Sequence, residues 1–286
     1  MSELPLKPLP YPVYFVIRDE KNWGDLFNGT IPPPADDLYN RFYNSRDCSC
    51  AQTYIHLKRR GLDVHLTPCI QKEKINVISY DDLLIKEFPY NAYLVTARGD
   101  RARPEICQQR LMQNQLNVQS KNDHFLPCWP MPHLKMRDPS RGLRLDTIVY
   151  KGLDIYLAKP FRSDTFLKDL QNIGVRLEMS QGGVDKRDAE WWDYAHADAV
   201  LAVRNCTSYD LSIKPASKLI NAWGAGCPAL LGPEPAYQAL RESDLDYIEV
   251  HTPEEALDAI KLLKNNPELH RAMIENGFRR FPKFNA

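Results

Sequence analysis

The sequence has no long apolar run and no leader-like start. No stretch of about 18 apolar residues occurs in the chain, so we expect no membrane-spanning helix. The first residues, MSELPLKPLPYP, lack the basic start and the apolar core of a secretory signal peptide. Together, these two absences predict a cytoplasmic location.

The chain also has no excess of one charge and no regular cysteine pattern. Its 37 basic and 37 acidic residues give a formal net charge of zero, so we expect no nucleic-acid partner. The seven cysteines are odd in number and irregularly spaced, which argues against a disulfide framework. Free thiols agree with a reducing, cytoplasmic environment.

What the chain does have is the length and apolar content of a two-domain globular protein. Its 286 residues, 43% of them hydrophobic, are enough for two cores. An apolar run at residues 13–17 is followed by a helical pattern at 45–60, ended by Gly61, and by a second run at 62–66. This strand–helix–strand order predicts an α/β fold with parallel sheets.

Further elements follow the same alternation. In the first half we expect a polar loop at 21–37, either a disordered surface loop or a flexible loop on the acceptor side, strands at 75–79, 92–96 and 116–118, and a helix at 104–113. In the second half we expect strands at 147–150, 175–178, 199–203 and 247–250, a loop at 207–213, and helices at 164–170, 252–264 and 266–277.

A charged cluster follows the strand expected at 92–96. Arg98, Asp100 and Arg101 would lie at the carboxyl end of that strand, where ligands bind in open α/β sheets. Two interpretations stay open. The cluster is either a salt-bridged turn, or Asp100 faces a cleft and accepts the proton of an attacking alcohol.

The segment at 214–237 predicts an anion site. Ser217 is a favourable N-cap for a helix at 218–225, which Gly226 would end before a strand at 229–231. The N-terminus of a helix attracts anions, and Lys214, Ser217 and Lys218 surround this one. The alternative is an ordinary capped helix with solvated lysines.

Two motifs carry a family resemblance. The stretch SKLINAWGAGCPALLGPEPAY, followed by an acidic turn and a TPEEA helix, resembles the C-terminal half of GT-B glycosyltransferases that use nucleotide sugars. The motif W-P-x-P-x-L with a following R-D-P-S-R-G, in a Pro-rich segment at 127–146, resembles a bacterial, notably cyanobacterial-type, subset of these enzymes. The resemblance is closest over 199–278 and faintest over the first 126 residues.

The resemblance implies a short version of the GT-B fold. Two Rossmann-like domains would face each other across a cleft. Residues 1–130 would form the acceptor side, and residues 131–286 would bind the nucleotide-sugar donor and end in C-terminal helices. The segment at 127–146 would be the linker between them.

The resemblance also implies roles for single residues. In the family, the small-residue helix holds the donor diphosphate and an acidic residue holds the ribose. Many retaining members carry two glutamates eight positions apart, but Ile213 and Asn221 stand in those positions here. The acidic residue of the GPE turn would serve the ribose instead. The expected donor-binding residues are Arg204, Lys214, Ser217, Lys218, Asn221 and Glu234, and Asp100 is the expected catalytic residue.

The resemblance, together with these residues, implies a glycosyltransferase. It would move a sugar, expected to be a hexose, from a nucleotide-diphosphate donor to an unidentified acceptor. Cations and a helix N-terminus can stabilise the leaving diphosphate, so we expect neither a metal nor a cofactor beyond this co-substrate. A nucleotide-sugar epimerase and a non-catalytic nucleotide-sugar binding protein remain alternatives, and the retaining or inverting outcome stays open.

Overall fold

The chain forms two compact units. The computed structural model describes residues 6–32, 41–42, 44–84, 91–179 and 190–285. The first unit comprises Met1–His133 with Ile213–Pro215, and the second comprises Leu134–Ser212 with Ala216–Ala286. We expected a boundary between residues 130 and 131, whereas the compact units change over between 133 and 134. Within the described ranges, no helix has both the length and the apolar character needed to cross a membrane.

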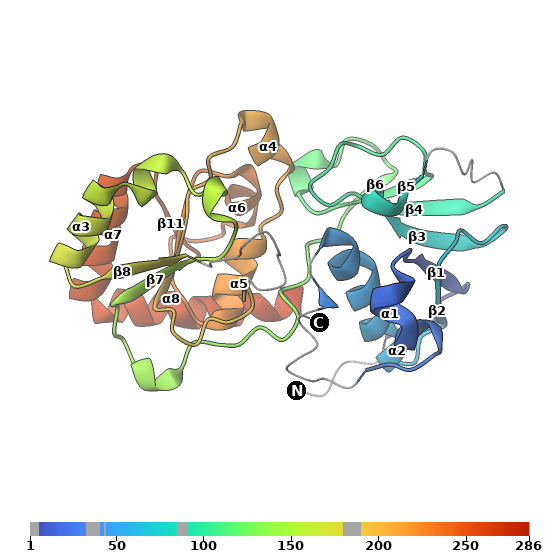
Figure 1. Ribbon diagram of the computed structural model, residues 1–286, viewed down its shortest axis with the longest axis horizontal. Coiled ribbons are helices and arrows are strands. Elements are labelled where there is room, and N and C mark those ends of the chain that lie inside the picture. Colours follow the sequence, from blue (N-terminus) through green and yellow to red (C-terminus); the bar gives the residue numbers. More distant parts are fainter. Residues whose placement is uncertain (1–5, 33–40, 43, 85–90, 180–189, 286) are drawn as a thin grey trace. The chain divides into compact units, whose positions relative to one another are not determined.

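The first unit is built on a six-stranded parallel sheet (Figure 1). The strand order is β2-β1-β3-β4-β5-β6, and every neighbouring pair is parallel. Its strands are β1 Val13–Val16, β2 Val64–Thr67, β3 Ile75–Ser79, β4 Tyr93–Ala97, β5 Gln109–Met112 and β6 Asp123–Phe125. Its helices are α1 Glu20–Phe27 and α2 Gln52–Arg59, the latter preceded by a π-helical turn at Asp47–Ala51.

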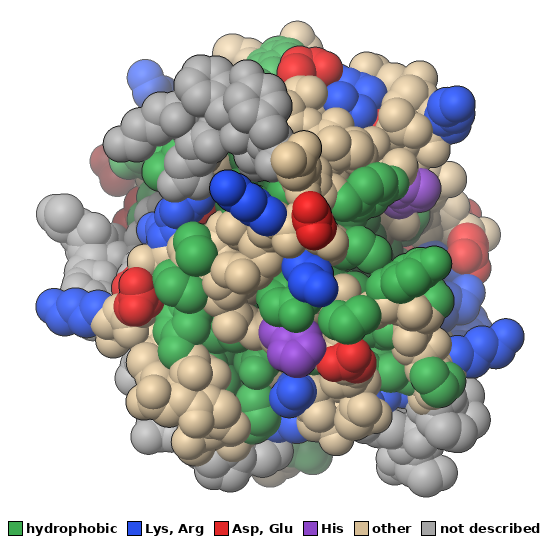
Figure 2. All heavy atoms as spheres, turned by 90° about the vertical axis from the view of Figure 1, so that its right-hand side faces the viewer, with side chains coloured by type: hydrophobic (Ala, Val, Ile, Leu, Met, Phe, Trp, Pro, Cys, Tyr) green, Lys and Arg blue, Asp and Glu red, His purple; other side chains and the backbone are tan. Residues whose placement is uncertain are grey.

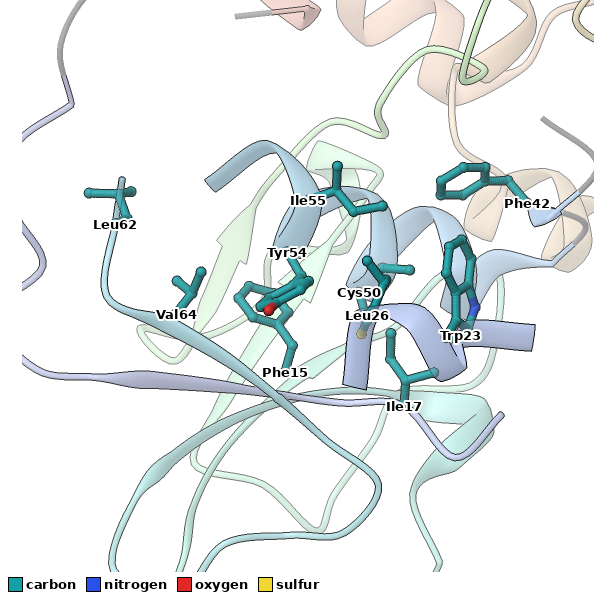
Figure 3. Close-up of a cluster of buried hydrophobic side chains, with 11 residues drawn as sticks. Phe15, Ile17, Trp23, Leu26, Phe42, Cys50, Tyr54, Ile55, Leu62 and Val64 are labelled. Carbon is teal, nitrogen blue, oxygen red and sulfur yellow. The ribbon is translucent and has the colours of Figure 1, made fainter. Parts of the chain in front are cut away.

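The core of the first unit lies between these helices and strands β1 and β2. Figure 3 shows Phe15 beside Tyr54, with ring centroids 6.2 Å apart, and Trp23 beside Phe42, with centroids 5.0 Å apart. Trp23 and Ile17 are completely buried. Burying a large apolar side chain stabilises a fold by about 1.5–3 kcal/mol, so these few contacts anchor α1 and α2 to the sheet.

The prediction of a polar loop at 21–37 is wrong for the first part of that range. Helix α1 occupies Glu20–Phe27, and the Asp19 side chain caps it by accepting a hydrogen bond from the Asn22 N–H at 3.1 Å. Trp23 and Leu26 are the buried residues of this helix, and Phe27 packs against the same core, so its polar majority hid the helical pattern. Residues 33–37 of the expected loop lie outside the described residues.

The assignments at 104–113 and 116–118 were also wrong. Residues 109–112 form strand β5, which pairs with β4 and β6, and Gln115–Asn117 form a single 3₁₀ turn. The ladder hydrogen bonds of β5 depend on neighbours distant in sequence, so tertiary pairing overrides the helical propensity of its Gln-rich segment.

The second unit is built on a five-stranded parallel sheet in the order β11-β10-β9-β7-β8 (Figure 1). Its strands are β7 Thr147–Tyr150, β8 Arg176–Met179, β9 Ala199–Ala202, β10 Ala229–Leu231 and β11 Ile248–Glu249. Its helices are α3 Asp164–Asn172, α4 Ser208–Ile213, α5 Ser217–Ala225, α6 Pro235–Leu240, α7 Pro253–Asn265 and α8 Pro267–Arg280. The strands agree closely with expectation, but α4 replaces the loop expected at 207–213.

Local capping bonds determine where the two C-terminal helices begin. The Thr252 side chain accepts a hydrogen bond from the Glu255 N–H at 3.3 Å, and Asn266 accepts one from the Leu269 N–H at 3.0 Å. A proline follows each cap at the first helical position, where its missing N–H costs nothing. The two predicted helices are thereby confirmed, although α8 continues to Arg280.

A buried aspartate fastens the segment before β7 to the second unit. The Asp198 carboxylate is fully buried and accepts hydrogen bonds from Arg137 and Arg141, each at 2.7 Å. The N–H of Thr147 donates to the same carboxylate at 3.0 Å. Residues 137–147 therefore belong to this unit as a bonded strap, and the change between the units, at 133–134, lies within the segment expected as a linker at 127–146.

The charges at the surface are mixed. The face in Figure 2, on the side of the first unit, carries basic and acidic side chains among hydrophobic ones. This mixture agrees with a formal net charge of zero.

Candidate functional site

The carboxyl edge of the second sheet gathers polar residues after three neighbouring strands. Tyr150 ends β7, Arg204 follows β9, and Glu234 follows β10. Parallel strands bring their carboxyl ends to one edge of the sheet, and ligands of open α/β sheets bind there. We therefore take this edge as the candidate site.

Arg204 and Glu234 form a buried ion pair. Their closest atoms, Arg204 Nη1 and Glu234 Oε2, are 3.0 Å apart, and the two side chains are 7% and 1% exposed. Burial disfavours the charged guanidinium, but the neighbouring Tyr237 and Glu234 outweigh it and raise the pKa of Arg204 above its usual value. The Glu234 carboxylate thus lies against Arg204, so a contact from it to a ribose stays a prediction.

Lys218 lies in the first turn of α5, against the loop that follows β7. Its Nζ donates a hydrogen bond to the Lys151 carbonyl at 2.6 Å and lies 5.3 Å from the centre of the Tyr150 ring. A Cβ added to Gly152 would meet both the Lys218 Nζ and the Tyr150 hydroxyl at 3.0 Å. Glycine at 152 therefore allows this loop to approach the start of α5.

Tyr150 connects the two parts of the site. It is 1% exposed, and burial is the main reason that its pKa is raised. Charge on Arg204 acts in the opposite direction on the same phenol, so the guanidinium lies near it. Because Lys218 also faces the Tyr150 ring, two of the three expected donor-binding cations lie around one buried tyrosine.

The helix α5 begins one residue earlier than expected. Ala216 is its N-cap and contributes no side-chain hydrogen bond, so the expected capping role of Ser217 is wrong. Gly226 ends the helix in the left-handed conformation, as expected, with φ 72°. All residues from 219 to 225 are buried, and Asn221 is 6% exposed, because helix and sheet surround α5.

The remaining two predicted residues pair with each other in the first unit. Lys214 Nζ lies 2.5 Å from Asp100 Oδ2, and the Lys214 carbonyl accepts a hydrogen bond from Asn114 Nδ2 at 3.3 Å. Burial alone would raise the pKa of Asp100, but the hydrogen bond and charge of Lys214 lower it below its usual value. Asp100 is therefore an ionised, paired carboxylate.

The surroundings of Asp100 agree with the salt-bridged turn. Arg101 Nε lies 2.7 Å from Asp81 Oδ1, and Arg98 Nε donates to the Arg101 carbonyl at 2.6 Å. A carboxylate with a lowered pKa is a weak base, so this geometry favours a positioning role for Asp100 over proton abstraction.

The sequence reasoning missed two neighbours of the site. These neighbours are Tyr150 and Lys151, which lie at the carboxyl end of the strand expected at 147–150. The Lys151 Nζ lies 5.4 Å from the centre of the Tyr194 ring, and burial lowers the pKa of Lys151. Their position after a buried strand was the available signal.

Two neighbouring aspartates of the second unit have structural partners. The Asp-x-Asp sequence at 244–246 forms a turn in which Asp246 accepts from the Glu242 N–H at 2.7 Å and Asp244 pairs with Arg241 at 3.0 Å. Over the described ranges, no group of three or more His, Cys, Asp or Glu residues is placed to hold a metal ion.

Comparison with known proteins points to one family. Residues 180–284 match the family described as glycosyl transferase-like. No curated protein sequence matches the chain. The solved structure of HepE from Anabaena is similar, with a TM-score of 0.54 at 11% identity over 96% of both chains.

Two further structures are similar over less of their length. Sucrose-phosphate synthase from Thermosynechococcus elongatus has a TM-score of 0.50 at 13% identity, over 89% of this chain and 76% of that one. TarM has a TM-score of 0.49 at 9% identity, over 76% of this chain, which spans about half, 53%, of TarM.

The fold of HepE agrees with the two parallel sheets described above, each flanked by helices. At such low identity this likeness shows the fold alone, and the family match covers residues 180–284. The chain therefore has the GT-B fold, and a region that lies largely in its second unit is similar to the glycosyl transferase-like family.

Proposed function

We propose that this chain moves a hexose from a nucleotide-diphosphate donor to an acceptor, and that the second unit binds the donor. One observation carries the proposal. Within the family-matched region, the buried Arg204–Glu234 pair and Lys218 lie around Tyr150 at the carboxyl edge of the sheet, beside the start of α5.

The chemistry of this edge suits a leaving nucleoside diphosphate. Negative charge develops on the diphosphate as the bond to the sugar breaks, and preorganised cations and N–H groups stabilise that charge. The first turn of a helix has N–H groups without a partner inside the helix, and it carries the positive end of the helix dipole. Lys218 adds a full positive charge at the same place.

Arg204 and Glu234 have a supporting part in this proposal. Glu234 fixes the guanidinium, and the fixed guanidinium contributes positive potential at the edge of the sheet. Lys214 and Asn221 stay proposed donor-binding residues, and Ser217 remains so through its place in the first turn of α5.

The first donor to test is a uridine nucleotide sugar. The similar HepE structures were solved with UDP, and with UDP and glucose. We propose that the transfer needs no metal and no further cofactor, because the cations of the chain take that role. We also propose a cytoplasmic location, which the seven free cysteines support.

Incubation with a panel of nucleotide sugars, UDP-glucose first, tests the proposal. Release of the nucleotide, with the sugar on water or on an added acceptor, is the expected result, and it persists in the presence of EDTA. An altered sugar without nucleotide release would indicate an epimerase. Binding without any chemical change would indicate a sugar-nucleotide binding protein.

A further inference from the structure

The chain after β7 forms an arch between the two cationic parts of the candidate site. One end of the arch meets α5, because the Lys151 carbonyl accepts the hydrogen bond from Lys218 Nζ at 2.6 Å. The other end meets the loop after β9, because the Tyr156 carbonyl accepts from the Asn205 N–H at 2.8 Å. Leu157 and Arg204 also form an antiparallel bridge.

Asp154 lies within this arch, and its carboxylate has no structural task that we can identify. It is the first residue of a short 3₁₀ turn, Asp154–Tyr156, which receives no side-chain cap. The residue is half-buried, its Oδ1 is buried, and that oxygen has no hydrogen-bond partner among the described residues. Leaving a buried acceptor unsatisfied costs about 1–3 kcal/mol.

We propose that Asp154 accepts hydrogen bonds from hydroxyl groups of the nucleotide sugar and thereby selects the donor. The inference rests on the proposed function and adds a specificity-determining residue to it. Unlike Glu234, which lies against Arg204, Asp154 has no cation paired with it in the described part of the chain. The described part of the chain therefore leaves the acceptor capacity of its Oδ1 unused.

The charge of Asp154 decides which part of the donor it takes. A carboxylate repels the diphosphate, so it does not bind there. An ionised carboxylate is an acceptor only, and a sugar offers neighbouring hydroxyl donors that such a group can bind in pairs. Both the ribose and the transferred sugar carry such hydroxyls, and the experiment separates these two sources.

The test is calorimetric titration of the wild type, Asp154→Ala and Asp154→Asn with UDP, 2′-deoxy-UDP and UDP-glucose, with GDP and GDP-mannose in parallel. If Asp154 binds the ribose, Asp154→Ala weakens UDP about 10- to 100-fold, the effect of one hydrogen bond to a charged group. In that case the substitution weakens the binding of 2′-deoxy-UDP less, because this ligand lacks one ribose hydroxyl. If it binds the transferred sugar, UDP is unaffected and UDP-glucose is weakened.

Asp154→Asn keeps the size of the side chain and one acceptor oxygen, so it should restore part of the lost affinity. A role confined to folding would instead lower the melting temperature of Asp154→Ala, whereas we expect that temperature to stay unchanged or to rise, because the variant removes a buried acceptor without a partner. Asp258→Ala removes an aspartate from the exposed surface of α7 and serves as the matched control.

The outcomes separate this inference from the proposed function. If the wild type binds the nucleotides and Asp154→Ala binds all of them equally well, the inference is overturned and the proposed function stands. If the wild type binds no nucleotide of either series, both fail together.

Discussion

Lys218 is the side chain whose removal we expect to weaken donor binding most. Its ammonium is held by the Lys151 carbonyl and the Tyr150 ring at the start of α5. The same arrangement explains why residue 152 is glycine, because a Cβ there would touch the Lys218 Nζ at 3.0 Å.

Replacing Lys218 by alanine should therefore weaken UDP binding by about 1.5–3 kcal/mol, the range for a hydrogen bond to a charged group. Isothermal titration calorimetry measures the change. Lys261→Ala, an exposed lysine on α7, is the control and should bind UDP like the wild type. Equal affinity of both variants would remove Lys218 from the donor site.

Asp47 is a second residue whose behaviour follows from its surroundings. Its side chain is fully buried in the first unit, where Oδ1 accepts a hydrogen bond from Trp23 Nε1 at 2.9 Å. Burial is the main cause that raises its pKa to about 7, against a usual value of 3.8. The folded protein thus holds a proton that the unfolded chain releases near pH 4.

Asp47 should therefore make the protein less stable as the pH rises. The raised pKa gives a stabilising contribution that is complete below about pH 4 and is lost as the pH rises to about 7. A difference of about three pKa units corresponds to on the order of 4 kcal/mol. Urea unfolding of the wild type and Asp47→Asn between pH 4 and pH 8 measures it.

The asparagine variant should lack this part of the pH dependence, since it cannot ionise. Parallel stability curves for the two proteins would contradict the raised pKa of Asp47. Asp258→Asn, at an exposed position, should follow the wild type at every pH.

At the scale of elements, the strap before β7 shows how one buried charge organises many residues. Asp198 stands just before β9 and neutralises Arg137 and Arg141, whose side chains are 6% and 10% exposed. Burial opposes its charge, but hydrogen bonds from Arg141 and from the Asp146 N–H lower the pKa of Asp198 well below its usual value.

Replacing Asp198 by alanine should cost about 3–5 kcal/mol of unfolding free energy, because the buried Arg137 would lose its counter-ion and Arg141 would keep only Asp146. Urea denaturation followed by circular dichroism measures the loss. Asp244→Ala removes an aspartate whose side chain is 99% exposed and should change the stability little. A loss of similar size in both variants would mean that Asp198 does not hold the strap.

The elements also show where sequence patterns were sufficient. Gly226 specified the end of α5, and Thr252 specified the start of α7, because each acts through a bond to its immediate neighbours. Strand β5 and helix α4 were not recognised. Strand β5 exists through pairing with β4 and β6, and its own sequence gives no strand alternation.

At the scale of the whole molecule, residues distant in the chain form single functional units. Lys214 and Asp100 are 114 positions apart and meet in the first unit, which takes residues 213–215 from the second half of the sequence. This pairing changes the role that we expect for Asp100 from general base to positioning residue. A carboxylate that pairs with an ammonium group holds that group in place.

Asp100→Asn and Lys214→Met should therefore lower the turnover of UDP-glucose to the same degree, while UDP affinity in Asp100→Asn stays near that of the wild type. The double variant should be no worse than either single variant, because partners in one contact are not additive. Steady-state turnover rates of the wild type, the two single variants and the double variant complete this double-mutant cycle. If the fold-loss of turnover in the double variant equals the product of the two single fold-losses, the residues act independently. That result would agree with a general base at Asp100.

Sequence patterns alone were enough to predict the α/β class, most strands, the starts of α7 and α8, the end of α5 and the region that resembles GT-B glycosyltransferases. These features depend on local backbone preferences and on apolar runs, which neighbouring residues specify. Only the tertiary structure decided that Glu234 pairs with Arg204, that Asp100 pairs with Lys214, and that Lys218 faces Tyr150. Charges pair through space, and a linear pattern does not record which of 37 acidic residues lies beside a given cation.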